Sequence, residues 1–142
     1  MRVMVIVHGN EESEGGKLPN RDELAKMMKF NEELAKAGVM LAADGLTPTS
    51  KGKRVRFSGA ERTVIDGPFA ESKELIAGYW IWQVKSMDEA VQWLKRAPFD
   101  GGSEVSIRPI FNPDDFGEAL TPELRAKEAQ LRDAIERQQN KS

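Results

Sequence analysis

The chain has 142 residues, of which 39% are hydrophobic and 31% are charged, and its formal net charge is −2 at pH 7. These values fit one small globular domain with an appendage. They exclude a broad phosphate-binding face, so we expect no direct nucleic-acid partner. The sequence has no cysteine, which excludes disulfides, thiolate nucleophiles and cysteine-ligated zinc.

The first half of the chain predicts a strand, a helix and a second strand. Residues 3–7 form a short apolar, β-branched run that is typical of a buried strand. Residues 10–18 are acidic and glycine-rich, which predicts a mobile loop. Asn20 is placed to cap a helix that Gly38 ends, and residues 39–46 predict the second strand.

The inward face of this first helix follows from apolar spacings of three and four residues. The predicted inward residues are Leu24, Met27, Met28, Asn31, Leu34 and Ala35.

The second half predicts a hairpin, a strand, a helix and a last strand. The hairpin is expected over residues 54–58 and 62–65, the strand over 77–84, the helix over 87–97 and the last strand over 104–111. Strand–helix–strand, given twice, is the order of a ferredoxin-like α+β sandwich, βαββαβ, here with an inserted β-hairpin. Residues 121–138 predict a polar C-terminal helix whose apolar edge is too narrow for it to be stable alone.

The start of the chain bears on its location. Met1 leads directly into the first strand, and that apolar run is too short for a signal peptide. No apolar run approaches the about 20 residues that a membrane-spanning helix needs. We therefore expect a cytoplasmic protein with no membrane partner.

Both faces of the central strands are apolar. Met4 and Ile6 point to one side of the first strand while its valines point to the other. In this topology both core helices cover the same face, so the second face needs other cover. A second subunit that packs sheet to sheet is the simplest solution, and we expect a homodimer in which Trp80 or Trp82 is buried.

Residues 66–74, DGPFAESKE, are the most informative stretch of the chain, because three carboxylates and a lysine surround a Gly-Pro turn. The run DGPFAESKELIAGYWIWQVKSMDEAVQWLKRAP resembles the signature of the DGPF, or YCII-related, family. Residues 1–117 resemble a member throughout, including KFNEELAKAGVMLAADGL, KGKRVRFSGAERTVIDGPF and SEVSIRPIF. The resemblance implies a ferredoxin-like fold that forms a dimeric α+β barrel. It also implies a domain over 1–117, followed by a helical extension over 118–142.

The expected topology brings several segments to one edge of the sheet. With strand order 4-1-3-2, the first strand ends where the third begins. His8 and the segment 66–73 should therefore share an edge with the loop 9–19 and the turn 98–103. The first helix also begins there, and its free amides favour an anionic ligand.

Asp66 and His8 are the candidate catalytic residues. Asp66 is either a general base or ligand anchor, or a brace for the Gly-Pro turn. His8 is the only histidine, and it is either a base that Asp66 orients or a strand-end residue with no task.

Glu71, Lys73 and Tyr79 are the candidate ligand-binding residues. The first two more often form a solvated charge cluster in such a pattern, and an aromatic such as Tyr79 on a central strand more often packs in the core or the dimer interface. Three ligands for a metal, His8, Asp66 and Glu71, have no motif spacing. We predict no metal and no cofactor.

Two functions remain open from the sequence. The first is a small-molecule enzyme or a ligand-binding protein with a cleft near Asp66. The alternative is a non-catalytic regulatory module that acts through a protein partner. The resemblance points to extracytoplasmic-function sigma factors as an example of such a partner. A third possibility is a dimeric scaffold whose signature loop is purely structural.

Overall fold

The structure is a computed structural model that describes residues 1–69 and 75–141. Its elements follow in the order β1 (Arg2–His8), α1 (Glu11–Glu14), α2 (Arg21–Lys36), β2 (Met40–Gly45), η1 (Thr49–Lys51), β3 (Lys53–Ser58), β4 (Glu61–Asp66), β5 (Ile76–Gln83), α3 (Met87–Leu94), β6 (Val105–Pro109), η3 (Pro113–Ala119) and α4 (Pro122–Gln139). The chain divides into two compact units, Met1–Ile110 and Phe111–Ser142. Each unit is described by itself.

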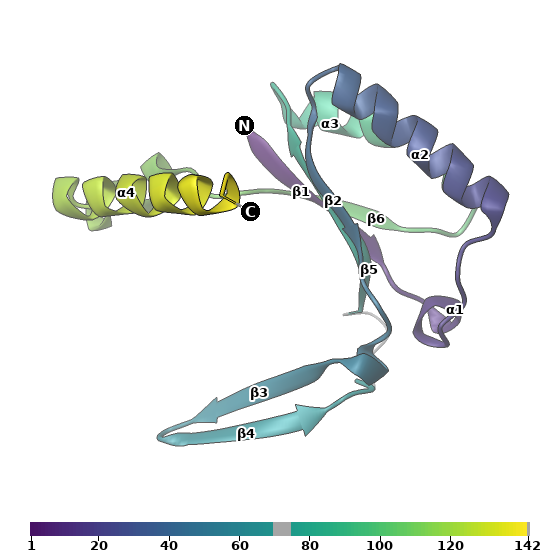
Figure 1. Ribbon diagram of the computed structural model, residues 1–142, viewed down its shortest axis with the longest axis horizontal. Coiled ribbons are helices and arrows are strands. Elements are labelled where there is room, and N and C mark those ends of the chain that lie inside the picture. The colour runs from purple at the N-terminus through teal and green to yellow at the C-terminus, as the bar shows by residue number, and fades with distance from the viewer. Residues whose placement is uncertain (70–74, 142) are drawn as a thin grey trace. The chain divides into compact units, whose positions relative to one another are not determined.

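The first unit contains a four-stranded antiparallel sheet with the order β2-β5-β1-β6. This is the predicted strand order. Among the residues that the structure describes, β3 and β4 pair only with each other, and they form a separate hairpin that extends from the sheet (Figure 1). The prediction of a ferredoxin-like α+β fold with an inserted hairpin and a C-terminal helix is confirmed.

Helices α2 and α3 lie on the same face of this sheet (Figure 1). The buried cluster between them consists of Val3, Val5, Phe30, Leu34, Val39, Trp80, Trp82, Val84 and Ala90. Trp80 and Trp82 are 4% and 0% exposed, so the helices of their own chain bury them. We expected a partner subunit to do this. That reasoning was wrong because strand alternation places both indoles on the helix side of β5, opposite Tyr79 and Ile81.

The inward face of α2 differs from the predicted one. Phe30 and Leu34 are buried, whereas Leu24 and Met28 are 45% and 61% exposed. The helix is rotated so that Phe30 meets Trp80 edge to face, with ring centroids 6.0 Å apart. The packing of Phe30 on Trp80 therefore sets the rotation of α2 about its axis, and the predicted row of apolar residues does not.

The predicted mobile loop over residues 10–18 contains a helix, α1. The Asn10 side chain accepts a hydrogen bond from Ser13 N at 2.9 Å, and Asn10 N donates to Ser13 Oγ at 2.9 Å. This reciprocal pair satisfies two backbone donors at the start of the helix. The loop prediction was wrong here because it relied on the glycines and overlooked the capping pair of Asn10 and Ser13.

The second unit consists of η3 and α4. Thr121 caps α4 by accepting from Leu124 N at 3.2 Å, and Pro122 occupies the first turn. No residue of α4 is buried, and Leu124, Leu131 and Ile135 are each about half exposed. No helix within the described part of the chain is long and apolar enough to cross a membrane.

Candidate functional site

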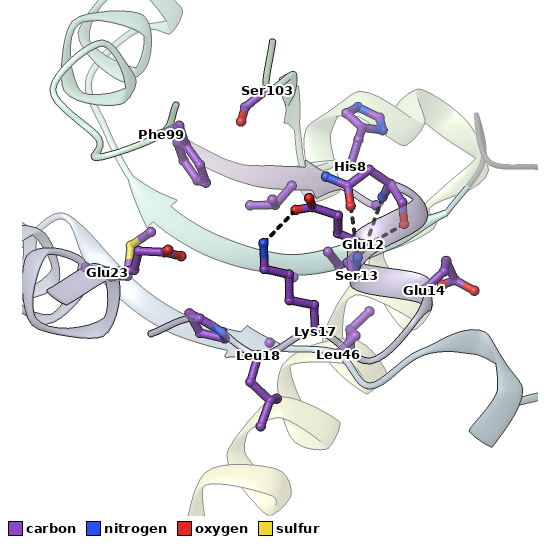
Figure 2. A pocket seen from close by; sticks show the side chains of 18 of the residues that line it. His8, Glu12, Ser13, Glu14, Lys17, Leu18, Glu23, Leu46, Phe99 and Ser103 are labelled. Carbon is purple, nitrogen blue, oxygen red and sulfur yellow. Dashed lines mark hydrogen bonds and ion pairs between the residues drawn. The ribbon is translucent and has the colours of Figure 1, made fainter. Parts of the chain in front are cut away.

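A large open cavity of about 1490 Å³ lies at the end of the sheet where β1 finishes and β5 begins. Its lining comes from residues 7–19, residues 23–31 of α2, residues 43–51 and residues 98–104, together with the start of β5. Most of the segments that we expected to share one edge do meet here, namely the end of β1, the loop 9–19, the start of α2 and the turn after α3. Figure 2 shows side chains from these segments around a common space.

One wall of the cavity is aromatic. Trp80 and Phe99 line it and meet edge to face, with ring centroids 6.0 Å apart. Asn31 of α2 lines the same wall and accepts a hydrogen bond at Oδ1 from Trp80 Nε1 at 2.9 Å. An apolar wall with a few fixed polar groups is the usual composition of a small-molecule site.

The opposite wall is the segment that contains α1. Lys17 Nζ lies 3.4 Å from Glu12 Oε2, and both side chains are well exposed. Figure 2 shows this pair in the middle of the cavity. Because the pair is solvated, it contributes little to stability, and its charges are accessible to a ligand.

His8 lines the cavity, but its ring has a partner on a neighbouring strand. His8 Nε2 lies 2.6 Å from Ser106 Oγ of β6, in a half-buried contact. In Figure 2 the ring points away from the Glu12–Lys17 pair. Ser106 was missed by sequence reasoning, although the pairing of Ile6 with Ser106 places it beside His8 once the register is known.

Tyr79 also lines the cavity and pairs with Asp44 across β2 and β5. Its hydroxyl donates to Asp44 Oδ2 at 3.2 Å. This hydrogen bond raises the pKa of Tyr79 above its ordinary value, and the negative charge of Asp44 adds to the effect. Tyr79 therefore stays a neutral donor. Asp44 was not among the predicted residues.

Asp66 lies at the end of β4, outside the lining of the two cavities described here. Its carboxylate forms an ion pair with Lys53 on β3, and the two side chains are 75% and 66% exposed. His8 and Asp66 thus have different partners, Ser106 and Lys53. Whether either residue takes part in catalysis stays a prediction. Glu71 and Lys73 lie outside the described residues.

The Gly-Pro turn of the signature packs on the start of η1. Thr49 Oγ1 donates to Glu14 Oε2 at 2.5 Å and accepts from Phe69 N at 3.1 Å, and Thr49 N donates to Glu14 Oε1 at 3.3 Å. Gly67 N donates to Gly52 O at 3.0 Å. We call Glu14, Thr49, Gly52, Gly67 and Phe69 the signature corner, because they join α1, η1 and the signature turn.

Gly67 has no room for a side chain. A Cβ atom there would lie 1.7 Å from the carbonyl oxygen of Thr49. The backbone of the turn therefore approaches η1 more closely than any residue with a side chain allows. A second cavity of about 340 Å³ adjoins the corner, and Arg54 stacks on Phe69 beside it, 4.1 Å from the ring centroid.

Across residues 1–69 and 75–141, no three His, Asp or Glu side chains converge as metal ligands would.

The comparisons with known proteins identify the family. The sequence profile of the YCII-related domain matches residues 1–114, and the chain belongs to this family. An uncharacterised protein of Rhizobium meliloti (strain 1021), R00369, is 32% identical over 100 residues, which cover 68% of this chain and 77% of that protein.

One solved structure is a distant match. It is the 5-chloro-2-hydroxyhydroquinone dehydrochlorinase (TftG) of Burkholderia phenoliruptrix AC1100 in complex with 2,5-dihydroxybenzoquinone. The TM-score is 0.39 at 14% identity, over 79% of this chain and 96% of that chain. At this TM-score the likeness says nothing about what this chain binds.

Proposed function

We propose that this YCII-related protein binds a small organic molecule in the cavity at the end of β1. The observation that carries the proposal is the composition of the cavity. Trp80 and Phe99 supply an apolar wall, and Asn31 of α2 supplies a neutral polar group beside it. Rigid aromatic rings and a few oriented polar groups provide both affinity and orientation for a small ligand.

The proposal is tested by blocking the cavity. Met27 lines it, whereas its neighbour Met28 is outside the lining and 61% exposed. A fragment library is screened by two-dimensional ¹H–¹⁵N NMR against the unmodified chain, Met27→Trp and Met28→Trp. We expect fragments that shift resonances of the cavity lining in the unmodified chain and in Met28→Trp, but not in Met27→Trp.

Two outcomes contradict the proposal. One is a screen in which no fragment shifts a lining resonance of the unmodified chain. The other is a set of shifts beside Met27 that persists in Met27→Trp, since the added indole occupies that part of the cavity. An enzymatic role for His8, which lines this cavity, or for Asp66, which lies outside its lining, is a further proposal that requires an identified ligand.

We also propose that the chain forms a homodimer through the open face of the sheet. Met4, Ile6, Tyr79 and Ile81 lie on the face opposite α2 and α3 and are only half-buried in the first unit. Ile6→Glu places a charge on this face. We expect sedimentation to show a dimer for the unmodified chain and a monomer for Ile6→Glu, while a monomeric unmodified chain contradicts the proposal.

The alternative function is a regulatory module that contacts another protein. One observation favours it: Leu124, Leu131 and Ile135 form an exposed apolar edge on α4. Such an edge fits an apolar groove on a partner. Removal of residues 118–142 should leave fragment binding unchanged, and loss of a cellular phenotype on this truncation would favour the regulatory function.

A further inference from the structure

We propose that Asn31 selects the ligand of the cavity and that the ligand carries a neutral carbonyl oxygen next to an aromatic ring. This inference rests on the proposed function, because it assigns a ligand class to the same site.

The orientation of the Asn31 amide is fixed by Trp80. An indole N–H can only donate, so the Asn31 atom 2.9 Å from Trp80 Nε1 is the amide oxygen. A flipped amide would bring two donors together. Trp80 itself is 4% exposed and is held between Phe30 and Phe99, whose ring centroids each lie 6.0 Å from its own. The indole cannot turn away without breaking the core.

The other end of the amide is left for a ligand. Asn31 Nδ2 has no hydrogen-bond partner among the residues that the structure describes, and Asn31 lines the cavity in a half-buried position. Because Oδ1 already accepts from Trp80, the Nδ2 end of the amide offers a ligand two N–H donors and no acceptor. A ligand oxygen that accepts from Nδ2 gains a hydrogen bond, and a ligand without one leaves the donor desolvated and unpaired.

The charges of the cavity favour a neutral acceptor over an anionic one. Six of the lining residues are acidic and three are lysines. Glu23 and Glu12 are among the acidic ones, so a carboxylate or phosphate ligand meets more like charge than opposite charge. A ketone, aldehyde or amide oxygen accepts from Nδ2 without that repulsion. The ring that carries it has the half-buried Phe99 to pack against, whereas Trp80, only 4% exposed, offers little free surface.

The test uses two probes of nearly the same shape, acetophenone and α-methylstyrene, in which a C=CH₂ group replaces the C=O group. Binding is measured by ¹H–¹⁵N NMR titration of the lining backbone amides and, where it is present, the Asn31 side-chain NH₂. We expect the unmodified chain to bind acetophenone about tenfold more tightly than α-methylstyrene, which is the effect of one hydrogen bond in a partly desolvated site.

Two variants isolate the amide. Asn31→Asp keeps the oxygen that accepts from Trp80 but removes both N–H donors, and it should lose the preference for acetophenone. Asn140→Asp makes the same change at the end of α4, outside the cavity, and should keep the preference. The Trp80 indole resonance reports whether its hydrogen bond survives in Asn31→Asp. The Trp82 indole, whose Nε1 is buried without a partner in the described part of the chain, serves as the internal reference.

Each result supports or overturns the inference. Equal binding of both probes to the unmodified chain overturns the inference and leaves the proposed function intact. A preference that persists in Asn31→Asp with the Trp80 bond preserved also overturns it. If neither probe shifts a cavity resonance, the ligand class is wrong, and the Met27 and Met28 variants then decide separately whether the cavity binds any small molecule.

Discussion

The helix-covered face of the sheet and the signature corner are held together by different forces. On the helix-covered face, Trp82 and Leu34 are fully buried, and stability comes from apolar surface removed from water. In the signature corner, Thr49 donates two hydrogen bonds to the Glu14 carboxylate, and Gly67 lies against a carbonyl group. The signature turn thus owes Gly67 to the close approach of two backbones, whereas the core owes its residues to the apolar volume that they bury.

The largest effect is expected on the helix-covered face. Leu34→Ala removes a fully buried side chain and should lower the free energy of unfolding by about 2–5 kcal/mol, from lost transfer energy and the cavity left behind. Urea denaturation at fixed protein concentration measures it. The matched control is Leu131→Ala, whose side chain is 61% exposed, with an expected change below about 0.5 kcal/mol. Similar losses in both variants would show that α4 is buried in solution.

The second largest effect is expected at Gly67, where the backbone of the signature turn lies against the backbone of η1. Gly67→Ala places a Cβ atom where the carbonyl oxygen of Thr49 now lies, so the turn must move. We expect a loss of about 2–3 kcal/mol, in the range of overpacked sites. Gly101→Ala is the control, because a Cβ atom there meets nothing within 4 Å. A loss below about 0.5 kcal/mol at Gly67 would contradict the close packing of the corner.

These two regions also differ in how far the sequence predicts them. The cap at Asn20 follows from local spacing and the strand order follows from the ferredoxin-like order of the elements, and the structure contains both. The cavity follows from that order, because topology fixes which strand ends meet. The rotation of α2 could not be predicted, because it depends on how Phe30 fits between two indoles.

The partners of the candidate site residues were also beyond the sequence. Ser106 and Asp44 join His8 and Tyr79 through cross-strand register, and no local motif encodes register. Asn31 was predicted to face inward, but its bond to Trp80 depends on the helix rotation. The Thr49 contacts join segments 20 and 35 residues apart in sequence, a separation at which a single sequence carries no pairing signal.

A smaller effect separates the hydrogen bonds of the corner from its packing. Thr49→Val keeps the shape of the side chain and removes the hydroxyl that bonds Glu14 and Phe69 N. We expect a loss of about 1–2 kcal/mol, since the partners are left without it in a partly buried site. Thr47→Val, at an exposed position two residues earlier, should change stability by less than about 0.5 kcal/mol. Equal effects would assign the corner's stability to packing alone.

The smallest effect on stability is expected at the signature aspartate. Asp66→Asn keeps the shape of the side chain and removes the charge that pairs with Lys53. Because both side chains are largely exposed, solvent screens the pair, and its loss should cost less than about 1 kcal/mol and should disappear at high salt. The control is Glu61→Gln, at an exposed position on the same strand. A loss well above that limit would mean that the carboxylate braces the turn.

Titration with a fragment from the cavity screen then decides whether Asp66 acts on a ligand. If affinity is unchanged while stability hardly moves, Asp66 is a surface residue of the hairpin. If affinity falls at least tenfold in Asp66→Asn but not in Glu61→Gln, the carboxylate acts on the ligand, and the site extends from the cavity to the hairpin.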